Sequence, residues 1–199
     1  MPPTPAPRPK VNRKTQILAH TATLLNQKGL AAVTTRAIAE AVGCSEGAIY
    51  VHFPNRLQLI LTVLEEALPE MLVPLHALNE KAGTATVRAN LTQAARGLQA
   101  FHDKVVPMIS SLFAEADLLA GFRESLASRD RGPQGGIARI ARYLQQEQKL
   151  GRISASLDAE TAAATLMASS FFAAFTRALL GRSLPALSPG RLVDSILRS

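Results

Sequence analysis

Apolar residues recur at helical spacing along most of the chain, and no stretch shows the period-two alternation of a strand. Near the N-terminus, Ile17, Leu18, Thr21, Leu24 and Leu25 share one face of a helix that we predict over about residues 11–28. The same pattern predicts further helices over 35–42, 46–52, 55–64, 85–103, 106–127, 133–150, 158–180 and 187–198. The expected fold class is therefore all-α.

Two of these helices are short and close together, which is typical of a helix-turn-helix. The pair Thr34-Thr35 stands at the start of the first, where a threonine hydroxyl can accept from free N–H groups of the first turn. Gly43-Cys44-Ser45 then makes a tight turn, and Ser45 can cap the second short helix. The spacing predicts a small N-terminal helix-turn-helix domain.

Proline and glycine suggest how the chain is divided. Residues 1–10 hold five prolines, so we expect a disordered, basic arm there. The helix-turn-helix domain is expected over 11–58 and a larger helical domain over 59–199. Pro69 and Pro74 are expected to kink or break the segment after the fourth helix, and Pro107 to separate two helices.

The charge is concentrated in the first third of the chain. Residues 1–60 carry seven Lys/Arg and two Glu, a net +5, whereas the remainder carries 15 basic and 13 acidic residues, a net +2. Such asymmetry indicates either a polyanionic partner such as nucleic acid or a solvated basic face. A protein that packages DNA without sequence preference would need basic charge spread over more of its surface.

Several classes of function and location find no support in the sequence. A single cysteine excludes a disulfide framework, and the four histidines show no helical metal-site spacing. No nucleophile elbow or glycine-rich phosphate loop occurs, so we expect no enzyme, metal or cofactor. Cys44 is either a redox-sensing thiol or, more simply, a small half-buried residue.

We also expect a cytoplasmic protein with no membrane partner. The longest apolar stretch, Thr161 to Thr176, is shorter than a membrane span needs. The first residues lack the apolar core of a signal peptide.

The region from Ile17 to Leu61 resembles the DNA-binding domain of the tetracycline-repressor (TetR) family of bacterial regulators. The string TTRAIAEAVGCSEGAIYVHFPNR carries most of the resemblance, which covers about 50 of the 199 residues. Beyond it, the chain resembles the family only in being helical, with long terminal helices. The resemblance implies a DNA-binding regulator whose C-terminal domain dimerises and usually binds a small molecule that lowers DNA affinity. Repression is the usual outcome in the family, with activation or ligand-independent regulation as alternatives.

The candidate phosphate contacts lie at the ends of the short helices. Tyr50 either donates its phenolic O–H to a phosphate or belongs to the core, and Thr35 can both cap its helix and offer its hydroxyl and N–H to a phosphate. His52 either binds a phosphate or caps its helix. Arg56 stands where the family usually carries Lys, and either cation can hold a phosphate. The arm residues Arg8, Lys10, Arg13 and Lys14 either follow DNA or form a solvated tail.

The candidate base contacts are exposed groups that would face the major groove. Arg36 can bond guanine O6 and N7, with a phosphate contact as the alternative. Glu46 can accept from cytosine N4, and Val51 can touch a thymine methyl. Gly47 would let the backbone approach DNA closely. The full predicted DNA-contact set is Thr35, Arg36, Ser45, Glu46, Gly47, Ala48, Tyr50, Val51, His52, Asn55 and Arg56.

A helix-turn-helix monomer reads only a half-site, so a homodimer on a palindromic operator is expected. For the dimer interface we predict one stripe on each of the last two helices, with a core role within the monomer as the alternative. The residues are Leu166, Ser170, Phe171, Ala174, Ala178, Leu187, Leu192 and Ile196.

The effector is expected to be small and apolar, because few ionisable groups interrupt the apolar faces of the C-terminal helices. Bulky residues that can line its cavity, or simply form the core, are Phe101, Met108, Phe113, Phe122, Tyr143, Met167 and Phe172.

Overall fold

A computed structural model describes residues 12–67, 72–128 and 132–198, and the part of the chain that it describes is all-helical. The predicted arm over residues 1–10, with Arg8 and Lys10, lies outside the described residues, as does Pro69. Contacts divide the chain into unit 1, which ends at Val63, and unit 2, which begins at Leu64.

Unit 1 is built from short helices that end at predictable residues. The helices are α1 (Arg13–Lys28), the 3-10 turn η1 (Leu30–Ala32), α2 (Thr35–Val42), α3 (Glu46–Tyr50) and the start of α4 (Arg56–Ala67). Asn12 caps α1 by accepting from the Lys14 N–H, and Thr34 caps α2 by accepting from the Ala37 N–H. Apolar side chains from every helix of the unit are buried, among them Ile17, Ile38, Ile49 and Leu59.

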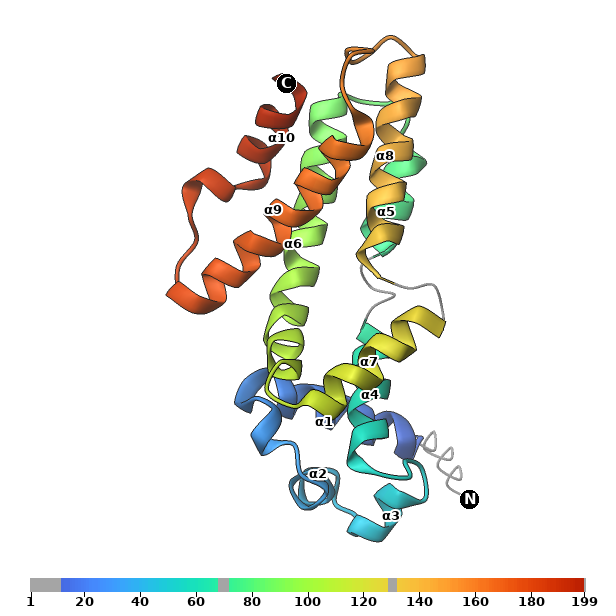
Figure 1. The fold of residues 1–199 in the computed structure, drawn as a ribbon, viewed down its shortest axis with the longest axis vertical. Helices are drawn as coiled ribbons and strands as arrows, with labels where there is room; N and C mark the ends of the chain where they lie inside the picture. The colour runs from blue at the N-terminus through green and yellow to red at the C-terminus, as the bar shows by residue number, and fades with distance from the viewer. Residues whose placement is uncertain (1–11, 68–71, 129–131, 199) are drawn as a thin grey trace, which may run out of the picture. The chain divides into compact units, whose positions relative to one another are not determined.

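Unit 2 is organised around one long helix, α6 (Figure 1). Its helices are α5 (Leu72–Asn79), α6 (Val87–Leu112), α7 (Ala116–Ser128), α8 (Pro133–Lys149), α9 (Ala159–Leu180), the 3-10 turn η3 (Pro185–Leu187) and α10 (Pro189–Arg198). α6 packs against α5, α9 and α10, while α8 packs against α5 and α9. A single apolar cluster joins these helices through buried residues such as Leu98, Ile140, Leu166 and Val193.

Two of the expected proline breaks are wrong. Pro74 lies in the first turn of α5, where a missing N–H costs no intrahelical bond. Pro107 lies inside α6, which continues to Leu112. Val106 and Met108 flank Pro107 and are buried, so the packing of this face offsets the lost hydrogen bond. The break between α6 and α7 therefore falls at residues 113–115.

α9 has 22 residues and is apolar enough, by length and composition, to cross a membrane. This finding differs from our expectation, because α9 extends beyond the stretch from Thr161 to Thr176 on both sides. α9 nevertheless packs against α6 and α8, and it buries Ala163, Leu166 and Met167 in the core of unit 2. A core helix with this packing passes the same test without entering a lipid bilayer.

A buried polar cluster ties the turn before α6 to the end of α8. Glu147 is completely buried; its Oε1 accepts from the Gly83 N–H at 3.1 Å, and its Oε2 lies 3.4 Å from an Arg152 nitrogen. Asn90 donates to the Tyr143 hydroxyl at 3.1 Å. Burial, partly offset by the Asn90 bond, raises the pKa of the Tyr143 hydroxyl to about 12, so this group stays neutral.

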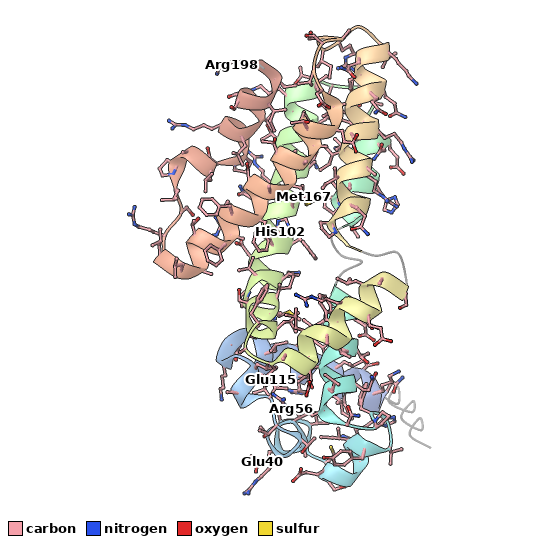
Figure 2. All side chains as sticks on the ribbon, viewed as in Figure 1. Glu40, Arg56, His102, Glu115, Met167 and Arg198 are labelled. Carbon is pink, nitrogen blue, oxygen red and sulfur yellow. The ribbon has the colours of Figure 1, made fainter. Side chains whose placement is uncertain are left out.

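His102 is buried on α6, with its ring edge-on to Phe171 of α9 at a centroid distance of 5.6 Å. Its place near the crossing of α6 and α9 is labelled in Figure 2. Burial lowers the pKa of the imidazole to about 4, and the charge of the neighbouring Asp103 opposes this only partly. The ring is therefore neutral in the folded protein at physiological pH.

The lowered pKa predicts a loss of stability in mild acid. The unfolded chain takes up the His102 proton near pH 6.5, whereas the folded chain resists protonation down to about pH 4, so the free energy of unfolding falls as the pH drops between these values. We expect the His102→Gln variant to lose about 2 kcal/mol less than the wild type between pH 7.5 and 5. Urea unfolding followed by circular dichroism measures this.

His76→Gln, at an exposed histidine on α5, is the matched control and should lose as much as the wild type. Equal losses in the wild type and His102→Gln would contradict the prediction.

Candidate nucleic-acid interface

The turn between α2 and α3 is closed by backbone hydrogen bonds, which set the angle between the two helices. Gly43 has a left-handed backbone (φ 69°), a conformation that glycine adopts without steric cost. The N–H groups of Gly43 and Cys44 donate to the carbonyl oxygens of Glu40 and Ala39. The Ser45 hydroxyl accepts from the Ala48 N–H at 3.3 Å and so begins α3.

α2 and α3 each bury one face and expose the other. Ile38 and Ala39 of α2 are buried, as is Ile49 of α3. The opposite faces carry exposed side chains at Arg36, Glu40, Glu46, Tyr50 and Val51, of which Val51 is 80% exposed. The candidate base-contact residues Arg36, Glu46 and Val51 are therefore exposed, as the sequence predicts, and their contact with bases stays a prediction.

Two polar contacts organise this exposed face. The Thr35 hydroxyl donates to a Glu46 carboxylate oxygen at 2.6 Å, which joins the first residue of α2 to the first residue of α3. Arg36 donates to Glu40 at 3.2 Å, one turn further along α2, and both side chains are largely exposed. Glu40 can be located on α2 in Figure 2.

Two of the predicted contact residues also hold the local backbone. Ser45 caps α3, and the Asn55 side chain accepts from the Gln58 N–H at 2.8 Å and caps the start of α4. His52 is exposed, with its ring 6.5 Å from that of Phe53. Two further predicted residues, Gly47 and Ala48, lie on α3. Gly47 is exposed and Ala48 is half-buried. A nucleic-acid contact stays a prediction for each of them.

Arg56 has a structural role that the sequence analysis missed. Its guanidinium donates to the backbone oxygens of Val33 at 2.7 Å and Leu30 at 2.9 Å, so it fastens the start of α4 to η1. The residue is labelled at the start of α4 in Figure 2. Because these donors point into the protein, the guanidinium is a positioning group for unit 1, and the phosphate contact stays a prediction.

The described part of the predicted basic arm is attached to unit 1. Arg13 donates to the backbone oxygen of Val42 at 3.3 Å, and the Lys14 ammonium lies 5.8 Å from the centre of the Phe53 ring. These two cations, the first residues of α1, therefore lie close to the helix-turn-helix. Cys44 is half-buried in the turn, which agrees with its simpler interpretation as a small turn residue.

The predicted effector residues do not form one set. Phe101, Met108, Phe122 and Met167 are buried on α6, α7 and α9, and an effector contact stays a prediction for them. Tyr143 is fully buried, and its hydroxyl is bonded to Asn90 within the core.

The other two predicted effector residues require correction. Phe113 is 72% exposed and Phe172 is 51% exposed, so neither lines the interior of the protomer. Phe113 follows the last residue of α6, and Phe172 lies on the outer face of α9. Shallow hollows on unit 2 are lined by other residues, among them Asp158, Arg191 and Arg152.

The predicted dimer stripe on α9 also requires correction. Leu166, Ser170 and Ala174 are buried within the protomer and cannot contact a partner. Ile196 of α10 is likewise buried, while Leu187 and Leu192 are half-buried. Of the predicted residues on α9, Phe171 and Ala178 are exposed.

The exposed apolar face of α9 is formed mostly by residues other than those of the predicted stripe. It consists of Phe171, Phe172, Phe175, Leu179 and Leu180, and the rings of Phe172 and Phe175 stack with centroids 6.4 Å apart. The spacing of Phe172, Phe175 and Leu179, three and then four residues apart, was the sequence signal for this face.

Among the described residues, no cluster of His, Cys, Asp or Glu could hold a metal ion.

Comparisons with known proteins match the N-terminal region most specifically. The family model described as "Bacterial regulatory proteins, tetR family" matches residues 17–63. The nucleoid occlusion factor SlmA of Marinomonas sp. is 40% identical over 62 residues, which are 30% of this chain and 32% of that protein. The HTH-type transcriptional repressor KstR2 of Rhodococcus jostii is 30% identical over 98 residues, or 48% of each chain. The chain therefore spans between a third and a half of the length of these relatives.

Similarity to solved structures extends over both units. The crystal structure of a protein described as a TetR-family transcriptional regulator, from Rhodococcus sp., superposes with a TM-score of 0.65. It is 25% identical, and the match covers 94% of this chain and 98% of that one. The predicted fold class is confirmed: a helix-turn-helix domain followed by a helical domain.

Gly47 offers a test of how closely a nucleic acid approaches α3. A Cβ added at this residue would meet only the Ser45 Oγ, at 3.8 Å, so the free protein has room for a side chain. Alanine also favours a helix over glycine by up to about 1 kcal/mol. We therefore expect Gly47→Ala to leave the free energy of unfolding unchanged or slightly raised, and to weaken DNA binding about tenfold.

Thermal unfolding and fluorescence anisotropy on duplex DNA measure the two effects. Gly135→Ala is the matched control, because Gly135 lies on α8 and an added Cβ meets nothing within 4 Å. Unchanged DNA affinity in Gly47→Ala would show that no DNA backbone lies against this residue.

Proposed function

We propose that this chain, a member of the TetR family of bacterial regulatory proteins, is a DNA-binding transcriptional regulator, namely a homodimeric repressor that a small apolar effector releases from a palindromic operator. The observation that carries the proposal is the exposed face of the helix-turn-helix. α3 buries Ile49 and exposes Glu46 and Tyr50, and Val51, which follows directly, is also exposed. A short helix held in this way can enter the major groove, where base edges are exposed.

Charge supports DNA as the partner of unit 1. The first 60 residues carry a net +5, while the rest of the chain is nearly balanced. A basic surface of this kind gains affinity for a phosphate backbone by releasing condensed counterions. We propose that the Tyr50 hydroxyl and the backbone N–H of Thr35, at the start of α2, donate to phosphates and that Arg36 reads a base. The repressor KstR2 of Rhodococcus jostii, similar over about half of the chain, supports repression as the outcome.

The exposed face of α9 supports the homodimer. Monomeric soluble proteins rarely expose several large apolar side chains together. A two-fold axis through this face would bring Phe172 and Phe175 of one protomer against the same face of its partner. The dimer would then present two helix-turn-helix units to the two halves of a palindrome.

Release by an effector requires that unit 2 influence unit 1, and α4 supplies a covalent link. α4 begins with Arg56 in unit 1 and ends in unit 2, where Glu65 accepts a hydrogen bond from Ser125 of α7. α7 also carries Phe122, one of the buried candidate effector residues. We propose that an effector beside α7 shifts α4 and so disfavours the DNA-bound conformation by its differential affinity for the two states.

We also propose a cytoplasmic location, because the cytoplasm is the compartment in which such a regulator meets DNA.

Selection from random duplex DNA, followed by fluorescence anisotropy, tests the DNA-binding proposal. We expect enrichment of a palindrome and an affinity for it that falls with salt concentration. Tyr50→Phe should weaken binding about fivefold on selected and scrambled duplexes alike, because a phosphate contact carries no sequence information. Arg36→Ala should also relax the preference at one position of each half-site by about 1–3 kcal/mol.

Arg182→Ala removes an exposed cation from unit 2 and is the matched control for Arg36→Ala. Equal losses on every sequence would make Arg36 a phosphate contact. If the wild type enriches no sequence, the proposal of a specific regulator is wrong.

Phe175→Asp tests the dimer. Phe175 is exposed in the protomer, so the substitution should spare the fold while placing a charge in the proposed interface. We expect light scattering to show a dimer for the wild type and mostly monomer for Phe175→Asp at micromolar concentration. Leu150→Asp, at an exposed leucine that ends α8, is the control and should stay dimeric. A dimeric Phe175→Asp would exclude this face as the interface.

A further inference from the structure

The hydroxyl of Thr35 is not used for capping, because its neighbour has that role. Thr34 caps α2 by accepting from the Ala37 N–H at 3.1 Å. Thr35 instead donates across the turn to Glu46, with 2.6 Å between the hydroxyl and carboxylate oxygens. The Glu46 carboxylate is likewise not used for capping, because Ser45 begins α3. The pair is therefore a bond between two helices that neither helix needs for its own start.

Within the described residues, Glu46 has no cationic partner. The other exposed carboxylate of this surface, on Glu40, is paired with Arg36 at 3.2 Å. Glu46 is held only by a neutral hydroxyl, which occupies one of its two oxygens. An ionised carboxylate accepts hydrogen bonds and donates none, so its second oxygen remains available to an external donor.

From this contact, and resting on the proposed function, we propose that Glu46 is a specificity-determining residue and that Thr35 positions it. Its ligand is the exocyclic amino group of a base in the major groove. Cytosine N4 and adenine N6 are the base amino groups that a carboxylate can accept from there. Where a site lacks such a donor, the unpaired carboxylate is repelled by the surrounding phosphates, so Glu46 also acts against the wrong sequences.

The link to Thr35 matters because a free glutamate side chain has several rotatable bonds. The hydroxyl holds the carboxylate in one place before DNA arrives, so less conformational entropy is lost on binding. Thr35 begins α2, so the position of the carboxylate depends on how α2 and α3 are held together by the turn.

The test compares base preferences among variants of the full-length protein. The wild type, Glu46→Ala, Thr35→Val and Thr35→Ser are each used in selection from random duplex DNA. Their affinities are then measured by anisotropy on the selected operator, on operators changed at one position, and on a scrambled duplex. Glu160→Ala is the matched control, because Glu160 is an exposed carboxylate in the first turn of α9, outside unit 1.

We expect the wild type to select cytosine or adenine at one position of each half-site. Glu46→Ala should reduce that preference about tenfold and raise the affinity for the scrambled duplex severalfold, because the repulsion is gone. Thr35→Val should reduce the preference severalfold, and Thr35→Ser, which keeps the hydroxyl, should restore it. Glu160→Ala should leave the preference unchanged.

An unchanged base preference in Glu46→Ala, with the wild type still selecting an operator, would overturn the role of Glu46 and leave the proposed function intact. Equal preferences in Thr35→Val and the wild type would overturn the positioning role of Thr35. A wild type that enriches no sequence would instead overturn the proposed function, and this inference with it.

Discussion

The packing of α3 against the core of unit 1 is the constraint on which the rest of that unit depends. A helix of five residues has no stability of its own in water, because nucleation costs more than so few hydrogen bonds return. α3 exists because Ile49 is buried almost completely, Phe53 is buried just after it, and the turn at Gly43 is closed by backbone bonds. Its outward residues are therefore presented on a rigid support.

The contacts around α3 show how this support is extended. Arg56 ties α4 to η1, Asn55 caps α4, and Thr35 joins α2 to α3 through Glu46. Several polar residues that could meet DNA are thus already bonded within the protein. A residue that is held before binding loses less entropy on binding, so such contacts and recognition of DNA are compatible.

Unit 2 follows a different constraint, the packing of long helices around α6. Here packing overrides local preference. Pro107 is accommodated inside α6 because the residues on either side of it are buried. The same crowding buries His102 as a neutral ring and holds Glu147 in the interior beside Arg152. Each of these polar groups constrains how far the helices can shift.

The sequence by itself determined the all-helical class, the helix-turn-helix and most helix ends, because caps and glycines act within a few residues of their position. Thr34, Ser45, Asp158 and Gly181 mark ends that need no distant contact. The outward face of α3 was also predictable from neighbouring residues. In so short a helix, the apolar positions fix which side chains are buried and which are exposed.

Only the tertiary structure decided the outcomes that depend on a partner far away in the chain. A stripe drawn at steps of four residues along α9, such as Leu166, Ser170 and Ala174, drifts around the helix, and the position of α6 decided that it is buried. Arg56 points to backbone oxygens 23 and 26 residues away, which no local pattern encodes. Neighbouring residues determine local hydrogen bonds and hydrophobic periodicity, whereas burial and long-range polar contacts arise only when the helices pack.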